Sequence, residues 1–190
     1  IKGTGTLFID PDESDAEKAF MIIQGARQSE KYRARLAPAL RAVSAFSGEE
    51  LWSLSLSRTR SYSRDCDASA LIWRDTAFIG LENGIFAVFD PSVKNRAMQD
   101  DLLQPVLSYT DTLFTPKDII GHGGNLVTEG SPARLRDRVY LASGSGHVYG
   151  YNLRTQEIDW DYFIGSDIDG SPVVTHDSCL LISVEKQYIR

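Results

Sequence analysis

Cysteine and long apolar segments are scarce in this sequence. Two cysteines among 190 residues are too few for a disulfide framework or for a zinc site. The longest wholly apolar run, 19–23, is far shorter than the roughly 20 residues that a membrane-spanning helix needs. Basic residues are in the minority, 20 against 26 acidic ones, and the net charge of −6 argues against non-specific binding of nucleic acid. These shortages exclude a small disulfide-stapled domain and a helical membrane protein.

The remaining composition is ordinary for a globular protein. Hydrophobic residues make up 42% of the chain, and its length is sufficient for one domain, or two small ones, with a buried core. The chain begins at Ile1, without an initiator methionine or a signal peptide. We interpret it as a processed or truncated piece, so the missing targeting signals do not indicate a compartment.

Internal repetition organises the sequence. Segment 69–80 matches segment 131–142 at an offset of 62 residues, and a third copy begins 40 residues later, at 171–183. A partial first copy ends at 47–52, which aligns with 155–160. The repeats share short runs of Val, Tyr, Leu and Ile between turn residues, so each unit reads as a group of short strands.

The unit around residue 150 is expected to contain four strands, at 131–135, 138–143, 147–152 and 158–163. Turn residues separate them, and in the preceding unit Asn83-Gly84 suits a tight hairpin that requires positive φ. No segment except Ser29–Leu40 has a helical pattern. A period near 40 residues with four antiparallel strands is typical of a β-propeller blade.

Two segments share a further spacing of polar residues and tryptophan. Segment 42–52 reads Ala-x-Ser-x-x-Ser-Gly-x-x-x-Trp, and 150–160 reads Gly-x-Asn-x-x-Thr-Gln-x-x-x-Trp. Both resemble the blade motif Ala-x-Asp-x-x-Thr-Gly-x-x-x-Trp of the quinoprotein-like repeat propellers, and the resemblance covers about 35–190. It implies that Trp52 and Trp160 wedge between neighbouring sheets and that the Thr or Ser caps a turn, which are structural roles.

The resemblance implies an all-β fold, a β-propeller of four-stranded antiparallel blades comparable to those of WD40-like repeats. The chain would supply about three and a half blades of one domain, as the units 1–60, 67–128, 129–168 and a partial 169–190. Members of the family usually have seven or eight blades, so we expect a larger ring, closed by further blades or by another chain. As an alternative, four-bladed propellers exist, and the strand-like Gly3–Asp10 would then complete the last blade.

The second unit departs from the regular pattern. Met98 stands at its tryptophan position, and an excess of 22 residues over the next unit lies within about 91–129. We expect this insertion, and the irregular stretch 27–41 of the first unit, to project from the rim as loops, where propellers usually bind their partners. Segment 27–64 has eight basic residues against three acidic ones. It forms either one face that docks an acidic partner or, as we favour, a solvated rim.

Enzymes of the resembling family hold pyrroloquinoline quinone (PQQ) against a vicinal Cys-Cys disulfide, with carboxylate and amide ligands for calcium and a catalytic aspartate. Here Cys66 and Cys179 are far apart and at non-equivalent repeat positions, so we interpret them as two buried small hydrophobic residues. Neither a nucleophile elbow nor a dinucleotide-binding glycine motif occurs. We therefore expect no catalytic, cofactor-binding or metal-binding residue, and PQQ and calcium have no support in these residues.

Three histidines and one acidic segment remain as candidates. His147 and His176 read as ordinary surface residues, at a strand start and in a hairpin turn. His122, in Gly-His-Gly-Gly-Asn, suits either approach to a ligand on a rim loop or, as we favour, a loop that needs flexible backbone. The segment Asp10–Glu17 resembles the calcium loop of integrin-type propellers, but Asp15 stands where such a loop needs glycine. We interpret it as an acidic solvated turn.

Structural repeat residues are clear in this sequence, whereas a catalytic constellation is missing. We therefore expect a non-catalytic scaffold that binds a protein or other macromolecular partner through rim loops, and no nucleic acid. One subtype of such a scaffold is an outer-membrane assembly protein that resembles the lipoprotein propellers of that machinery. The alternative is a divergent PQQ-dependent dehydrogenase whose cofactor residues lie outside this chain. Family resemblance alone favours a periplasmic or extracellular location.

Overall fold

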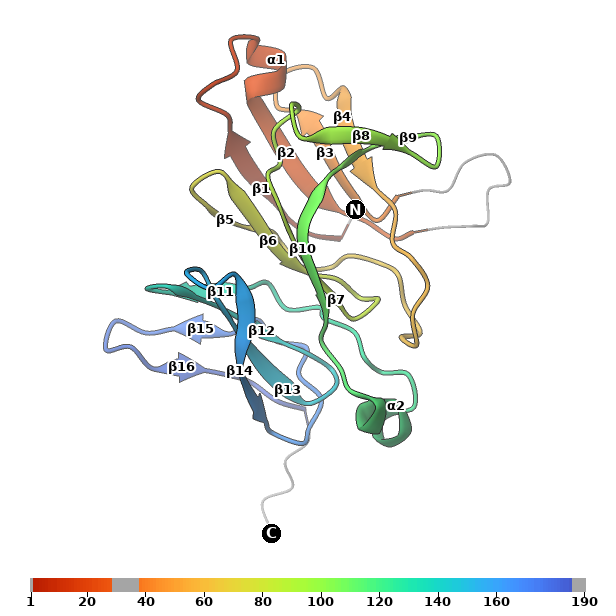
Figure 1. The fold of residues 1–190 in the computed structure, drawn as a ribbon, viewed down its shortest axis with the longest axis vertical. Coiled ribbons are helices and arrows are strands. Elements are labelled where there is room, and N and C mark those ends of the chain that lie inside the picture. Colours follow the sequence, from red (N-terminus) through yellow and green to blue (C-terminus); the bar gives the residue numbers. More distant parts are fainter. Residues whose placement is uncertain (1, 29–37, 186–190) are drawn as a thin grey trace.

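The computed structural model describes residues 2–28 and 38–185, which form sheets of antiparallel strands (Figure 1). The first sheet contains, in hydrogen-bonded order, β1 (Lys2–Ile9), β2 (Phe20–Gly25), β3 (Leu40–Ser44) and β4 (Glu50–Leu54). Burial alternates along β2 and β3, as the period of two in a β-strand requires. Met21 and Ile23 of β2 are among the most deeply buried side chains of the core.

Three further sheets and one hairpin follow along the chain. The second sheet contains β5 (Leu71–Trp73), β6 (Thr76–Gly80), β7 (Ile85–Phe89) and β10 (Leu107–Thr112). Between β7 and β10 a separate hairpin is inserted, formed by β8 (Arg96–Gln99) and β9 (Leu102–Pro105). The third sheet contains β11 (Ala133–Leu135), β12 (Arg138–Ala142), β13 (His147–Asn152) and β14 (Glu157–Phe163). The fourth has two strands, β15 (Val173–Val174) and β16 (Leu180–Leu181).

The strands expected in the third unit are confirmed. β13 has the expected bounds, and the other three strands of the sheet agree with the expected ranges to within about two residues, an ordinary uncertainty of strand ends. The inserted hairpin does not project freely from the rim, because β9 packs beside β4 of the first sheet (Figure 1). The helix expected over 29–40 lies outside the described residues for 29–37, and Leu40 begins β3.

Two helices occur that the sequence patterns did not indicate. α1 (Ala16–Ala19) is a single turn, and α2 (Pro116–His122) lies in the segment expected to be an inserted loop. α2 begins with a capping box, in which the Thr115 amide donates to the Asp118 carboxylate at 2.6 Å. It ends at Gly123, whose φ of 59° is left-handed, so this glycine after His122 closes a helix. In the part of the chain that the structure describes, no helix is long and apolar enough to cross a membrane.

The N-terminal strand belongs to the first sheet, so the alternative that Gly3–Asp10 completes the last blade is wrong. β1 pairs with β2, with Leu7 opposite Ile22 and Phe8 opposite Met21. Strands joined by a short connection usually pair with each other, and Phe8 is buried in the core of this sheet. Among the described residues the sheets therefore do not close into a ring, as expected for part of a propeller (Figure 1).

Aromatic side chains join neighbouring sheets. The Trp52 ring in β4 packs edge-on against Phe89 in β7, with ring centroids 5.6 Å apart. Its Nε1 donates a hydrogen bond to the Pro91 carbonyl at 2.8 Å. Trp52 is 1% exposed, so the wedge expected from the family motif is confirmed at this position.

In the second sheet a tyrosine occupies the position that the sequence alignment assigned to methionine. Tyr109 of β10 lies opposite Val88, as Trp160 lies opposite Gly150 in the third sheet. Met98 instead lies in the inserted hairpin and is 66% exposed. An alignment without gaps reaches the hairpin first, because the hairpin precedes the outer strand in the chain. The assignment of Met98 to the tryptophan position is therefore wrong.

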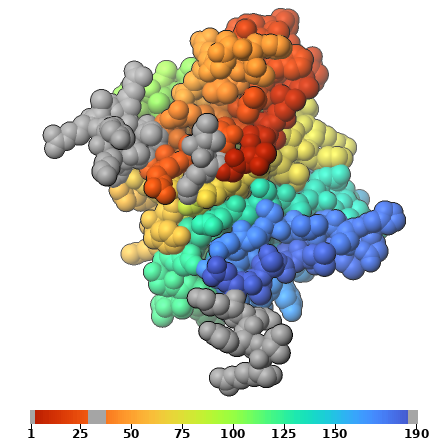
Figure 2. Space-filling view, turned by 180° about the vertical axis from the view of Figure 1, so that it is seen from behind, coloured from red at the N-terminus to blue at the C-terminus, as the bar shows by residue number. Residues whose placement is uncertain are grey.

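The third and fourth units form the end of the molecule opposite the first sheet (Figure 2). An apolar groove of about 620 Å³ lies between them. It is lined mainly by Tyr140, Val148, Trp160, Tyr162, Leu180 and Ile182. In a four-stranded blade the third and fourth strands would cover such a groove, and β15 and β16 alone do not.

Candidate functional site

Antiparallel pairing places the connections of each sheet at its two ends. We call one end the turn face; it carries the connections 74–75, 90–106, 136–137 and 153–156. We call the other end the linker face; it carries the hairpins and linkers 55–70, 81–84, 113–132, 143–146 and 164–172. Polar side chains gather on both faces, in different combinations.

A cleft of about 520 Å³ opens on the turn face between the second and third sheets, and we call it the inter-sheet cleft. Its more deeply buried lining is apolar and comes from Phe78, Val88, Tyr151 and Leu153. Its exposed lining is polar and comes from Arg74, Asp137, Arg154 and Gln156. A concave site with an apolar floor and a few polar groups at its rim is the usual form of a binding site.

Tyr109 forms one side of the inter-sheet cleft. Its hydroxyl donates to Asp111 Oδ2 at 3.0 Å and accepts a hydrogen bond from the Ile158 amide at 3.4 Å. Burial raises the pKa of Tyr109 to about 12, and the neighbouring Asp111 carboxylate acts in the same direction. The phenol is therefore protonated at neutral pH, and it serves as a hydrogen-bonding group and not as a base.

A second cleft, the side cleft, has a volume of about 450 Å³ and lies beside the first on the turn face. Arg136 and Arg138 contribute to its walls, and Ser178 of the fourth unit lines its far side. Asp137 and Arg154 form an ion pair and line both clefts. The two clefts thus form one continuous polar surface with an ion pair at its centre.

An arginine stack borders the inter-sheet cleft. The guanidinium of Arg134 lies 3.4 Å from the centroid of the Trp73 ring, and that of Arg74 lies 5.8 Å from it. Trp73 itself lines the cleft. This cation–π arrangement presents positive charge beside an aromatic surface.

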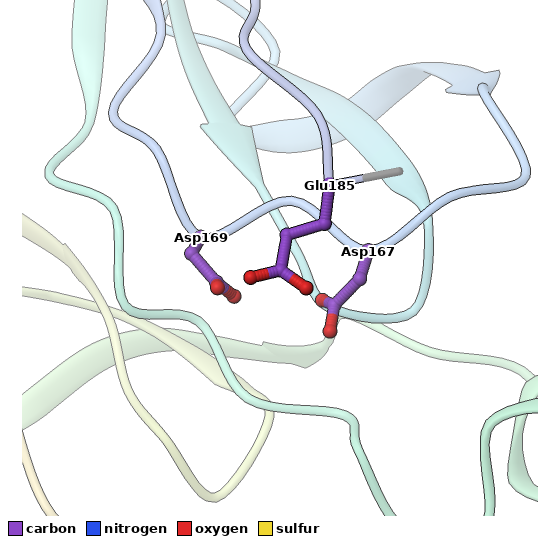
Figure 3. Close-up of side chains that lie close together, drawn as sticks. All are labelled: Asp167, Asp169 and Glu185. Atoms are coloured by element: carbon purple, nitrogen blue, oxygen red, sulfur yellow. The ribbon is translucent and has the colours of Figure 1, made fainter. Parts of the chain in front are cut away.

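Three carboxylates gather on the linker face (Figure 3). Asp167 and Asp169 come from the linker before β15 and Glu185 follows β16, and one oxygen of each lies within 4.8 Å of the others. Burial raises the pKa of Asp167 and of Asp169, and the charge of Glu185 raises both further. The Asn125 amide donates to Asp167. Such a group of oxygen atoms can take a divalent cation or share a proton.

A repeated sequence signal could have indicated Asp169, one member of this carboxylate group. Asp67, Glu129 and Asp169 each stand two positions before the first-strand serine of their unit. The same position in successive blades reaches the same face, so the acidic residues recur on the linker face. None of these three carboxylates is among the site residues predicted from the sequence.

Of three solved structures similar to this chain, one is BamB and two are quinohemoprotein alcohol dehydrogenases. BamB from Moraxella catarrhalis matches at 17% sequence identity and a TM-score of 0.52, over 92% of this chain and 42% of that chain. Quinohemoprotein alcohol dehydrogenase ADHIIG from Pseudomonas putida HK5 matches at 11% sequence identity and a TM-score of 0.56, over 85% of this chain and 20% of that chain. The quinohemoprotein alcohol dehydrogenase from Comamonas testosteroni matches at 16% sequence identity and a TM-score of 0.51, over 85% of this chain and 22% of that chain. The chain has the fold of a quinoprotein-like β-propeller.

The chain spans less than half the length of each of these three structures. No protein-family model and no curated protein sequence matches it. At such low identities the likeness concerns the fold alone. It confirms the all-β propeller architecture expected from the repeats.

The cysteines of the propeller do not fit PQQ as the family resemblance requires. Cys66 is buried in the linker between the first and second sheets, whereas Cys179 is exposed just before β16, and neither forms a disulfide. The expectation that both cysteines are buried is therefore wrong for Cys179, because among the described residues no outer strands cover the two-stranded fourth sheet. The carboxylates of the linker face offer oxygen ligands of the kind that calcium prefers.

His147 is buried, contrary to its interpretation as a surface residue. It is 8% exposed, its Nδ1 lies 2.7 Å from Asp161 Oδ1, and its Nε2 lies 3.4 Å from Asp118 Oδ1. Asp118 belongs to α2, so the unpredicted helix is what covers the histidine. Burial alone would raise the pKa of Asp118, but hydrogen bonds from Thr115 and the neighbouring His147 hold it below its usual value. His176 does lie exposed in the hairpin turn, as expected.

The acidic segment Asp10–Glu17 forms a turn followed by α1, and its carboxylates bind groups within or beside the turn. Asp10 accepts from the Asp12 amide at 3.0 Å, and Asp15 accepts from the Lys18 ammonium at 2.7 Å. The hydrogen bond from Lys18 lowers the pKa of Asp15. These contacts agree with the interpretation as an acidic turn.

Parts of the basic stretch 27–64 lie outside the described residues, namely 29–37. Of its described arginines, Arg27 pairs with Asp65 at 3.1 Å, and Arg41 pairs with Glu50 at 3.5 Å. These arginines are neutralised locally by acidic residues of the first two units. The positive charge available on the turn face comes from other residues.

Proposed function

We propose that this chain is part of a non-catalytic β-propeller that binds a protein or other macromolecular partner through its loops. The observation that carries the proposal is the polar, open surface of the two clefts on the turn face, which combines arginine, tryptophan and tyrosine. These residue types are enriched where proteins bind one another. The Tyr109 hydroxyl beside the cleft both donates and accepts hydrogen bonds, which suits recognition.

The proposal extends to the organisation of the whole protein. The units 1–60, 67–128, 129–168 and 169–190 belong to one propeller domain, which further blades or another chain complete to a ring. The apolar groove beside the fourth unit supports this, since covering it would remove apolar surface from water. A periplasmic or extracellular location is part of the proposal and rests on the resemblance.

Photo-crosslinking in the native host tests the binding function. Benzoylphenylalanine is placed, one position at a time, at the exposed turn residues Asp75 and Asp101 and at the exposed Lys117 of α2, in the full-length protein. We expect at least one position to capture one defined protein, identified by mass spectrometry and recovered again with a purified partner. If no position captures a protein, the proposal is wrong.

A second candidate is a divergent PQQ-dependent dehydrogenase whose cofactor residues lie outside this chain. Two of the three similar structures are quinohemoprotein alcohol dehydrogenases, and the carboxylates of the linker face offer oxygen ligands. The full-length protein, incubated with PQQ and calcium, is assayed for dye reduction with alcohols and sugars. Turnover that depends on both additions would establish this candidate and overturn the non-catalytic one.

A further inference from the structure

We infer that the turn face binds an acidic segment of a partner protein, laid across the inter-sheet cleft and the side cleft. This inference rests on the proposed binding function and names the chemistry of the partner. The carboxylates of the segment would meet the arginines of the clefts, and its apolar side chains would enter the floor of the inter-sheet cleft.

The charge of the two clefts is opposite to that of the chain. The whole chain has a net charge of −6, yet the charged residues that line the clefts are four arginines and one aspartate: Arg74, Arg136, Arg138, Arg154 and Asp137. The carboxylate group of Asp167, Asp169 and Glu185 lies on the linker face. Positive charge thus exceeds negative charge in the lining of the two clefts, where it attracts and orients an acidic segment.

Two of these arginines lie free for a ligand. Arg74 and Arg136 are exposed, and within the described part of the chain neither forms an ion pair, whereas Arg154 pairs with Asp137 and Arg138 with Asp159. A guanidinium presents a planar fork of donors that binds a carboxylate through two parallel hydrogen bonds. Each unpaired arginine can therefore take one carboxylate of the segment.

The backbone at these two positions is unusual for arginine. Arg74 and Arg136 have φ of 54° and 52°, in the left-handed region that glycine and asparagine adopt more readily. They occupy equivalent turns of two successive units. A charged, exposed side chain thus occurs at the same strained position in two successive units, which points to a role for the charge.

The floor of the inter-sheet cleft determines the second half of the ligand. Phe78, Val88 and Tyr151 are buried beneath the arginine rim, and Trp73 stands beside it under the Arg134 guanidinium. A side chain such as Leu or Phe, next to an acidic residue, fits this combination of apolar floor and charged rim. A nucleic acid carries a negative charge on every nucleotide, and the net negative charge of the chain disfavours its binding.

Fluorescence anisotropy with defined probes tests the inference. The probe is a short fluorescein-labelled peptide in which Asp and Glu alternate with Leu and Phe, and it is titrated with the full-length protein at low ionic strength. The test variant is R74N/R136N, in which asparagine suits the left-handed turns, so the fold is retained while both charges are lost. The matched control is R27Q, which removes an arginine from the linker face.

We expect the Kd of the peptide to rise about tenfold in R74N/R136N and to stay unchanged in R27Q. Loss of one exposed charge pair weakens binding about threefold, so loss of both pairs weakens it about tenfold. The variant R74D/R136D should instead bind a matching peptide with Lys and Arg in place of Asp and Glu. Equal Kd values for the native protein and R74N/R136N would overturn the inference.

Two other outcomes also overturn it. One is absence of peptide binding to the native protein, and the other is displacement of the peptide by oligothymidylate at a lower concentration than by unlabelled peptide. Neither outcome bears on the photo-crosslinking result, which tests whether the propeller binds a partner at all. Failure of this inference is therefore distinguishable from failure of the proposed function.

Discussion

The backbone amide of Ser131 donates a hydrogen bond to the side-chain hydroxyl of Ser171 at 2.9 Å. The same bond joins the Ser69 amide to the Ser131 hydroxyl at 2.9 Å, and the Thr4 amide to the Ser69 hydroxyl at 3.2 Å. Each unit is thus linked to the next at one repeat position, beside its first strand. The ladder ties the two-stranded fourth unit to the third, although that unit has no outer strands in the described part of the chain.

The serine ladder predicts a loss of stability in Ser131→Ala. The substitution removes the acceptor of the half-buried Ser69 amide, and we expect the free energy of unfolding to fall by about 1 kcal/mol. Urea denaturation followed by tryptophan fluorescence measures it. Ser57→Ala is the control, because the exposed Ser57 lies outside the ladder. Equal stability of both variants would contradict a structural role of the ladder.

Tyr109, and not Met98, occupies the inter-sheet position of the second sheet, so truncating these two side chains should have unequal effects on stability. Tyr109→Ala removes a ring that contacts Tyr151 and Phe86, with centroids 5.1 Å and 6.1 Å away, so we expect a loss of about 2 kcal/mol. Met98→Ala truncates an exposed side chain and should change stability by less than about 0.5 kcal/mol. Thermal unfolding of both variants measures this, and a larger effect at Met98 would refute the assignment.

The two carboxylates around His147 predict that this residue secures α2. His147→Ala leaves the buried Asp118 without its histidine partner, and we expect a loss of about 2–3 kcal/mol. Amide hydrogen exchange of 116–122 should accelerate, because the contact between α2 and the third sheet is lost. His176→Ala, in an exposed turn, is the control and should leave both measurements unchanged. Slow exchange of 116–122 in His147→Ala would show that other contacts hold the helix.

The acidic group on the linker face predicts a pH-dependent effect of Asp169→Asn. Burial, followed by the charges of Asp167 and Glu185, raises the pKa of Asp169 above 3.8. A carboxyl whose pKa is higher in the folded state than in the unfolded state binds a proton more readily when the protein is folded. Its contribution to stability therefore falls as the pH rises from the unfolded-state pKa through the folded-state pKa. The variant lacks this titration. We therefore expect its stability, relative to the native protein, to rise between about pH 4 and about pH 7.

Chemical denaturation at a series of pH values measures this difference. Taking the difference between variant and native protein cancels carboxyls such as Asp15 and Asp159, whose lowered pKa values act in the opposite direction. Asp75→Asn, on the turn face, is the control. A constant difference across the pH range would mean that the three carboxylates do not interact in solution.

Local patterns in the sequence predicted the blade architecture well. The strand 147–152 follows from alternation and turn residues, which act over a few neighbouring residues, and the inter-sheet role of Trp52 was implied by the resemblance of its motif to a known family. The same patterns failed where the chain is interrupted. Because the inserted hairpin separates β7 from β10, Tyr109 and not Met98 occupies the inter-sheet position. His147 is buried because α2 packs over it.

The candidate site depended on the fold to a greater degree than the blades did. Arg74 and Arg136 are recognisable as equivalent turn residues in the sequence, but their common surface requires the packing of the second sheet against the third. Asp169 and Glu185 belong to different segments of the fourth unit, and only the chain path between them brings their carboxylates together.

By itself, the sequence determined that the chain is a row of repeated units of short antiparallel strands. The repeat period and the turn residues are local properties, and they survive substitution of individual core residues. Only the tertiary structure decided which charges share a face and which histidine is buried. Those properties arise from contacts that the units make with one another and with the inserted segments. Such contacts depend on packing in space and do not follow from the periodic pattern of residues along the chain.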